Sequence, residues 1–200
     1  MAIGAEYNDG NGSASGHVRI FQWIESASTW TQVGADIDGE ARSDFSGSSV
    51  SLSSDAKTVA IGAEFNDGNG ARSGHVRIFQ WTESASTWTQ VGADIDGEAS
   101  DDESGFSVSL SSDGKTVAIG AVGNDGNGSR SGHVRIFQWT ESTSAWIQVG
   151  ADIDGEERGD LSGKSVSLSS DGKSVAIGSE DNDGNGTRSG HVRIFQWNHG

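Results

Sequence analysis

Acidic side chains recur at a fixed spacing along this chain, and they are the residues best suited to chemistry. One cluster runs from Asp94 to Glu98, and copies of it lie 58 residues before and after. Carboxylate oxygens are the ligands that Ca²⁺ prefers, so the cluster is a candidate site for Ca²⁺ or for a basic ligand. The alternative is a solvated turn, because charged residues most often face water. The candidate ligands in this pattern are Asp36, Asp38, Glu40, Asp94, Asp96, Glu98, Asp152, Asp154 and Glu156.

A second acidic element is the loop at 66–70, Asn-Asp-Gly-Asn-Gly, which also recurs in every copy. Its oxygens and flexible backbone suit Ca²⁺. The same residues form tight turns, because Asn and Asp accept local hydrogen bonds and Gly tolerates positive φ. A single carboxylate per loop favours the turn and leaves a cation site as the alternative. The carboxylates concerned are Asp9, Asp67, Asp125 and Asp183. We expect both acidic elements to lie on one face of the fold.

Aromatic and imidazole side chains offer two further kinds of site. The Trp residues could stack on sugars, although their regular placement favours packing between repeated units. The candidate ligand-binding residues are Trp23, Trp30, Trp81, Trp88, Trp139 and Trp146. A His occurs at 17, 75, 133 and 191. A ring of His could bind a metal or sense pH, but an identical His in every unit is more often a structural hydrogen-bonding residue.

No pattern in the chain indicates catalysis. There is no Ser-His-Asp arrangement distinct from the repeat itself, and no phosphate loop, zinc motif or Cys nucleophile is present. A catalytic site is usually one asymmetric constellation, whereas this repeat copies every candidate residue. We therefore expect no enzyme, no catalytic residues and no cofactor other than Ca²⁺.

Composition narrows the choice of partners. The formal net charge of −16 argues against nucleic acid, because phosphate binding requires a basic surface. No apolar run approaches the ~20 residues that span a bilayer, and the start of the chain does not resemble a signal peptide. The chain opens inside a repeat, so we interpret it as a fragment or as part of a longer array.

The positioning elements follow from the repeat, which is 58 residues long. Each unit holds segments of alternating or β-branched residues; in the second copy these are 49–53, 58–63, 75–81 and 88–95. Asp-Gly at the first connection predicts a hairpin. Four antiparallel strands per unit are typical of a β-propeller blade. A β-solenoid is the main alternative, but its strands are parallel.

The predicted fold is therefore an all-β propeller of four-stranded antiparallel blades, with 14 strands in one repeat domain. We expect blades at 43–100 and 101–158, an incomplete blade at 1–42 without its first strand, and one at 159–200 without its fourth. Open edges invite pairing with another chain. We expect a homodimer that completes a ring of about seven or eight blades, or otherwise a higher homo-oligomer or filament.

Four segments of the third unit carry a resemblance to a known family. They are 104–110 (Ser-Gly-Phe-Ser-Val-Ser-Leu), 113–115 (Asp-Gly-Lys), 117–121 (Val-Ala-Ile-Gly-Ala) and 132–137 (Gly-His-Val-Arg-Ile-Phe). Together they resemble the FG-GAP repeat of integrin-α-type propellers. The resemblance implies a propeller with a non-enzymatic role at an extracellular or cell-surface location.

The chain departs from the family pattern at two places. The Phe-Gly element is scrambled, for example to Phe-Ser-Gly at 45–47 and Leu-Ser-Gly at 161–163. The Asp-x-Asp-x-Asp-Gly loop, which binds calcium in many such repeats, is replaced by Ser-Asp-Ala-Lys at 54–57. The family's own calcium site is therefore not expected here.

These observations predict a non-enzymatic, self-associating scaffold or binding module. Two alternatives stay open. One is a carbohydrate-binding propeller lectin, using Trp or loop pockets once per blade. The other is an engineered or recently amplified assembly with no ligand. Besides a second copy of itself, a glycan or a basic protein is the expected partner.

Overall fold

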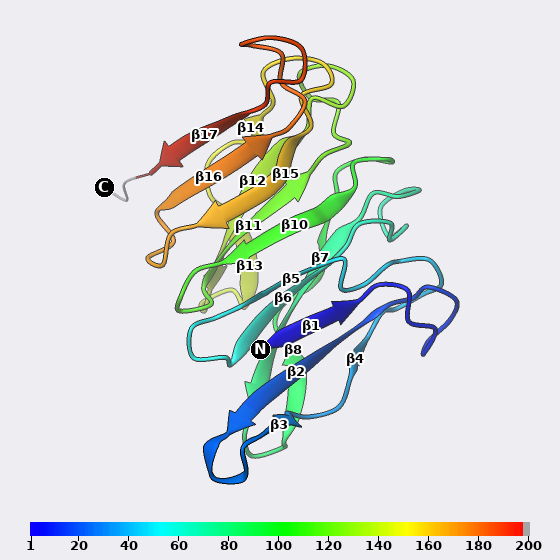
Figure 1. Ribbon diagram of the computed structural model, residues 1–200, viewed down its shortest axis with the longest axis vertical. Coiled ribbons are helices and arrows are strands. Elements are labelled where there is room, and N and C mark those ends of the chain that lie inside the picture. Colours follow the sequence, from blue (N-terminus) through cyan, green and yellow to red (C-terminus); the bar gives the residue numbers. More distant parts are fainter. Residues whose placement is uncertain (198–200) are drawn as a thin grey trace.

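Four antiparallel β-sheets make up the computed structural model, which describes residues 1–197. The sheets stack face to face in chain order along the long axis of the molecule, with the N-terminal sheet at one end and the C-terminal sheet at the other (Figure 1). The only helical element in residues 1–197 is a 3₁₀ turn, η1 (Glu25–Ala27). The predicted all-β propeller fold is confirmed.

The same strand order recurs in each sheet. The N-terminal sheet contains β1 (Ala2–Ala5), β2 (His17–Ile24), β3 (Thr29–Gln32) and β4 (Ile37–Asp38). The second contains β5 (Ser49–Leu52), β6 (Thr58–Ala63), β7 (His75–Thr82), β8 (Thr87–Gln90) and β9 (Ile95–Asp96). The third contains β10 (Ser104–Leu110), β11 (Thr116–Ala121), β12 (His133–Thr140), β13 (Ala145–Gln148) and β14 (Ile153–Asp154). The fourth contains β15 (Ser162–Leu168), β16 (Ser174–Ser179) and β17 (His191–Gln196).

The outer edge of each complete sheet differs from the prediction. The sequence pattern predicts one outer strand over 88–95, but the structure has two, β8 and β9, which both pair with β7. Gly92 separates them with φ at +79°, a left-handed conformation that favours Gly. The Trp139 ring lies 3.0 Å from where a Cβ of Gly92 would be. The described residues therefore form 17 strands rather than 14, the three additional ones being the two-residue strands β4, β9 and β14.

The core lies between the sheets rather than within any one of them. At the first seam, Val18 and Ile20 of β2 pack against Val59 and Ile61 of β6 and Phe79 of β7. The next two seams use the corresponding residues. At the second seam they include Val76, Ile78, Val117, Ile119 and Phe137, and at the third Val134, Ile136, Val175, Ile177 and Phe195. Each sheet thus presents one fixed face to the sheet before it and another to the sheet after it.

The inner strands approach one another closely. A Cβ on Gly62 of β6 would lie 2.0 Å from the carbonyl oxygen of Gly105 in the next sheet. Ser49 Oγ donates a hydrogen bond to the same oxygen at 2.6 Å. Gly120 and Gly163 repeat this approach one seam later, at 2.2 Å. The small residues predicted for the inner strand therefore let neighbouring backbones meet.

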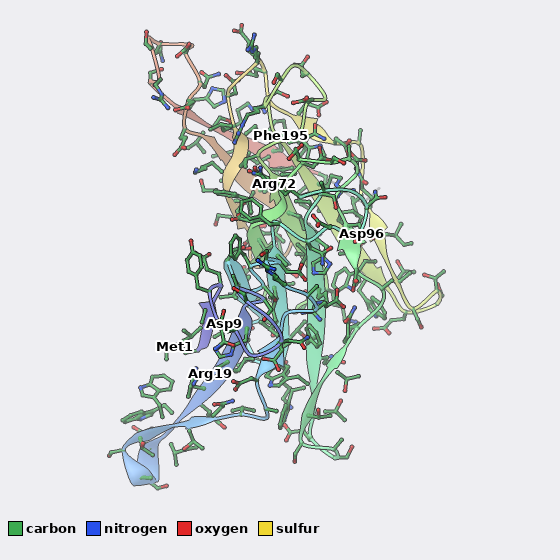
Figure 2. All side chains as sticks on the ribbon, turned by 90° about the vertical axis from the view of Figure 1, so that its right-hand side faces the viewer. Met1, Asp9, Arg19, Arg72, Asp96 and Phe195 are labelled. Atoms are coloured by element: carbon green, nitrogen blue, oxygen red, sulfur yellow. The ribbon has the colours of Figure 1, made fainter. Side chains whose placement is uncertain are left out.

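The two end sheets expose faces that are buried in the middle of the stack. Val192 and Ile194 of β17 are 67% and 76% exposed, whereas their counterparts Val76 and Ile78 are 0% and 2% exposed. At the opposite end, Ile3 is 44% exposed. Figure 2 shows Met1 and Phe195 on the sheets at opposite ends of the stack. The four sheets therefore form an open arc and do not close a ring among themselves.

Candidate functional site

The predicted acidic cluster lies at the seams between sheets, beside the recurring His. His75 opens β7, and its Nδ1 lies 3.8 Å from Asp94 Oδ2 of the same sheet. Glu40 Oε2, from the preceding sheet, lies 3.9 Å from the same nitrogen. The third sheet repeats this geometry, with His133 Nδ1 3.9 Å from both Asp152 Oδ2 and Glu98 Oε2. Each seam site therefore takes its His and Asp from one sheet and its Glu from the sheet before.

A Gln at the end of the outer strand orients the Asp of each site. Gln90 Nε2 donates to Asp94 Oδ1 at 2.6 Å, which leaves Oδ2 facing His75. Gln148 does the same for Asp152 at 2.7 Å. The pair is four residues apart and brackets the Gly bend that splits the outer strand.

A buried Arg two residues after the His ties the same seam together. Arg77 Nη2 donates to the backbone carbonyl of Asp38 in the preceding sheet at 2.7 Å. Its Nη1 lies 3.6 Å from Glu40 Oε1, and its guanidinium carbon lies 5.3 Å from the Phe79 ring centroid, within cation–π range. The next two sheets repeat the backbone contact through Arg135 and Arg193.

Burial controls the charge of the two central imidazoles. Desolvation lowers the pKa of His75 below its usual 6.5, and Arg77 acts in the same direction, while Asp94 and Glu40 oppose the shift. The pKa of His133 is lowered by the same causes. Both rings are therefore neutral near pH 7, and a neutral imidazole keeps a nitrogen lone pair. Although His133 is only 1% exposed, neither of its ring nitrogens has a hydrogen-bond partner.

The structure divides the predicted metal-binding residues of the acidic cluster into three groups. Four of them lie in complete His-carboxylate groups: Glu40, Asp94, Glu98 and Asp152. Two accompany a His without a second carboxylate, since Asp36 lies 3.3 Å from His17 and Glu156 lies 3.5 Å from His191. In the described part of the chain, the remaining three fall in no group of three potential ligands; these are Asp38, Asp96 and Asp154.

The second acidic loop has the hydrogen bonds of a tight turn. Asp67 Oδ1 accepts from the Arg72 backbone N–H at 2.7 Å, and Asn66 Oδ1 accepts from Gly68 N–H at 2.8 Å. Asn69 Nδ2 donates to Gly97 O at 2.8 Å, which places the loop against the acidic cluster, as predicted. The carboxylates at the four equivalent positions all accept a backbone N–H five residues on: Asp9, Asp67, Asp125 and Asp183.

The Trp residues divide between packing and exposed positions. Trp88 Nε1 donates to Val33 O of the preceding sheet at 2.8 Å, and Trp146 repeats this contact one seam later. Trp81 and Trp139 pack against these two rings, with centroids 5.4 Å and 5.6 Å apart.

On the N-terminal sheet, Trp23 and Trp30 are 44% and 50% exposed. Together with Trp81 they line a pocket of about 480 Å³. Of the predicted sugar-binding aromatics, these are the ones that the structure brings together at an open surface.

Sequence reasoning missed the Gln and the cross-sheet role of the Glu. Gln90 and Gln148 recur at the repeat spacing, four residues before an Asp, and that fixed offset was the available signal. The partnership of Glu98 with His133 joins residues 35 positions apart in different sheets. It depends on how one sheet stacks on the next, which a linear pattern does not reveal.

Stacked, four-stranded antiparallel sheets whose core lies at the seams define a β-propeller-type repeat protein. The FG-GAP repeat family model matches residues 91–137. This segment runs from the end of one sheet through β9, β10 and β11 into β12 of the next. The chain thus carries FG-GAP-type propeller repeats, in the segment where the sequence resemblance lies.

Solved structures share this fold at low sequence identity. Hydrazine synthase of Kuenenia stuttgartiensis matches with a TM-score of 0.52 and 12% identity, over 90% of this chain and 42% of that chain. The periplasmic gluconolactonase of Pseudomonas aeruginosa matches with a TM-score of 0.56 and 13% identity, over 98% of this chain and 49% of that chain. The chain therefore spans less than half the length of either protein.

No curated protein sequence matches the chain. In residues 1–197, no helix has the length and apolar character needed to cross a membrane.

Proposed function

We propose that this chain is a non-catalytic, self-associating propeller scaffold. In the proposed contact, the exposed face of the C-terminal sheet of one copy packs on the exposed face of the N-terminal sheet of a second copy. The observation that carries the proposal is that the two exposed end faces are the two halves of the internal seam.

The correspondence follows the repeat. At the first internal seam, Val18 and Ile20 pack against Val59 and Ile61. On the C-terminal face, the counterparts of the first pair are Val192 and Ile194. On the N-terminal face, the counterparts of the second pair are Met1 and Ile3, which are 49% and 44% exposed. A second copy therefore offers these side chains the same kind of apolar partner that the internal seams already use.

Energetics favour a reversible contact of moderate strength. Full burial of a Val, Ile or Met side chain stabilises by about 1.5–3 kcal/mol. Association costs at least about 4 kcal/mol in lost translational and rotational freedom. Four such side chains exceed that cost by a few kcal/mol, so we expect dissociation constants in the micromolar range.

The contact is head-to-tail, because the two faces differ. Such a contact gives a ring when the rotation closes and a filament when it does not. The expected homodimer is the smallest closed product. The FG-GAP resemblance supports an extracellular or cell-surface location for such a scaffold.

Light scattering over a range of concentrations tests the proposal. We expect the mass to rise with concentration to about twice 20.8 kDa. Ile194→Asp is expected to hold the chain at the monomer mass. Ile147→Asp is the matched control, because Ile147 is also exposed, at 48%, but lies on the outer strand β13. A wild-type chain that stays monomeric near 1 mM, or an Ile194→Asp variant that still associates, would overturn the proposal.

A lectin is the second candidate, and the pocket lined by Trp23, Trp30 and Trp81 favours it. Exposed indole rings at a pocket of about 480 Å³ suit the apolar face of a sugar ring. Binding of a glycan, followed by Trp fluorescence and lost in Trp23→Ala, supports this role. Binding that survives in Trp23→Ala assigns the sugar to another surface.

A further inference from the structure

The geometry points to two divalent transition-metal sites at the internal seams, a property independent of the proposed self-association. One site consists of Glu40, His75 and Asp94. The other consists of Glu98, His133 and Asp152. In each, one imidazole nitrogen and two carboxylate oxygens lie within 4.8 Å of one another.

The donor separations fit a small ion. Donors about 2.1 Å from a tetrahedral zinc ion lie about 3.4 Å from one another. The His75 nitrogen lies 3.8 Å and 3.9 Å from its two carboxylate oxygens. Each separation therefore has to shorten by only about 0.5 Å. The two carboxylates are partly exposed, so they have room to make this movement.

The unpartnered imidazole is the independent sign of a ligand. Burying a polar nitrogen without a hydrogen bond costs free energy, so such atoms call for an explanation. Both ring nitrogens of His133 are buried and unpartnered, and Nδ1 faces Glu98 and Asp152. Gln148 holds Asp152 by its other oxygen and keeps Oδ2 toward the ring. The site is thus oriented before any ion binds.

The donor set selects the class of metal. One imidazole and two carboxylates suit Zn²⁺ and neighbouring first-row ions, with water completing the coordination. Ca²⁺ takes six to eight oxygen ligands and is a poor match for a site with one imidazole and two carboxylates. The sequence therefore singled out the right carboxylates in Asp94 and Glu98, but the site favours a different ion.

A neighbouring cation limits the affinity. Arg135 Nη1 lies 3.8 Å from Glu98 Oε1, so two carboxylates and one guanidinium leave a local charge of about −1. The guanidinium also donates to Asp96 O at 2.6 Å, which holds it on the side away from the ring. We expect dissociation constants in the range of about 1–100 µM.

Incomplete copies of the site provide an internal control. His17 has Asp36 but lacks a Glu from a preceding sheet, and His191 has Glu156 but lacks the Asp. The repeat therefore offers two complete sites and two half-sites in the described residues. Two bound ions per chain, rather than four, is the expected stoichiometry.

Equilibrium dialysis of the intact chain against Zn²⁺ is the first measurement. We expect two equivalents for the wild type, one for Glu98→Gln and none for the double variant Glu40→Gln/Glu98→Gln. Asp36→Asn is the control and should retain both equivalents. Circular dichroism of each variant establishes that it is folded. The partly exposed Glu positions are chosen because replacing the buried His puts folding at risk.

Co²⁺ absorbance is the second measurement. A d–d spectrum that disappears in the double variant supports ligation at the seam. The proposal is overturned if the double variant keeps its two equivalents, if the wild type takes up no Zn²⁺ below 1 mM, or if Ca²⁺ displaces Zn²⁺ at equal concentration.

Discussion

Replacing Gly62 by Ala tests whether backbone contact between sheets sets the spacing of the stack. The new Cβ would lie 2.0 Å from Gly105 O of the next sheet. Gly178 occupies the same position in the C-terminal sheet, where no further sheet follows. A Cβ on Gly178 would lie within 3 Å of only Ser165 Oγ, a side-chain atom that can rotate away. The pair therefore separates the cost of the sheet contact from the cost of placing Ala in this strand.

The magnitude follows from the distances. Ordinary contact of a Cβ with an oxygen is about 3.4 Å, so the two backbones must separate by about 1.4 Å at Gly62. Overpacking of a tight interior costs about 1–3 kcal/mol, and we expect Gly62→Ala to reach at least the upper end because backbone has to move. Gly178→Ala is expected to be neutral or to stabilise by up to about 1 kcal/mol, since Ala suits a strand better than Gly.

Thermal unfolding followed by circular dichroism provides the assay. For a chain of this size, about 3 kcal/mol corresponds to a fall of roughly 6–12 °C in the midpoint. Gly178→Ala should melt within about 3 °C of the wild type or above it. Equal midpoints for the two variants would show that close backbone approach does not hold the sheets, and the steric argument would be wrong.

Two further predictions use the same kind of matched comparison. Trp88→Phe removes the indole bond to Val33 O and should cost about 1 kcal/mol more in urea unfolding than Trp30→Phe, whose ring has no preceding sheet; equal costs would contradict a bonding role. Burial, reinforced by Glu103 and Glu6, raises the pKa of Glu64 from 4.5 to about 7. The wild type is therefore fully stable below pH 4.5 and loses stability as pH rises through 7. Glu64→Gln should be more stable than the wild type at pH 8 by about 1 kcal/mol after solvent screening, and equal to it at pH 4, as measured by urea unfolding at both values.

The sheets themselves were predictable, because alternating apolar residues and Asp-Gly turns are local signals. The break between β8 and β9 was not, since Gly92 bends the chain against Trp139, a residue from the next sheet. The metal candidates illustrate the same limit. Asp94 and Glu98 are neighbours in sequence and were predicted as one cluster. In the structure they belong to different sites, because Asp94 faces the His of its own sheet and Glu98 the His of the next.

Because every seam is built from copies of the same residues, the molecule has a natural quantum of length. Excising any 58 consecutive residues from the middle of the chain, such as 59–116, would join equivalent positions and recreate the seam that was cut. No compensating substitution would be needed, whereas the loss of 57 or 59 residues would shift strands out of register and reverse their faces. Changes in the number of sheets are therefore far better tolerated than small insertions within one sheet.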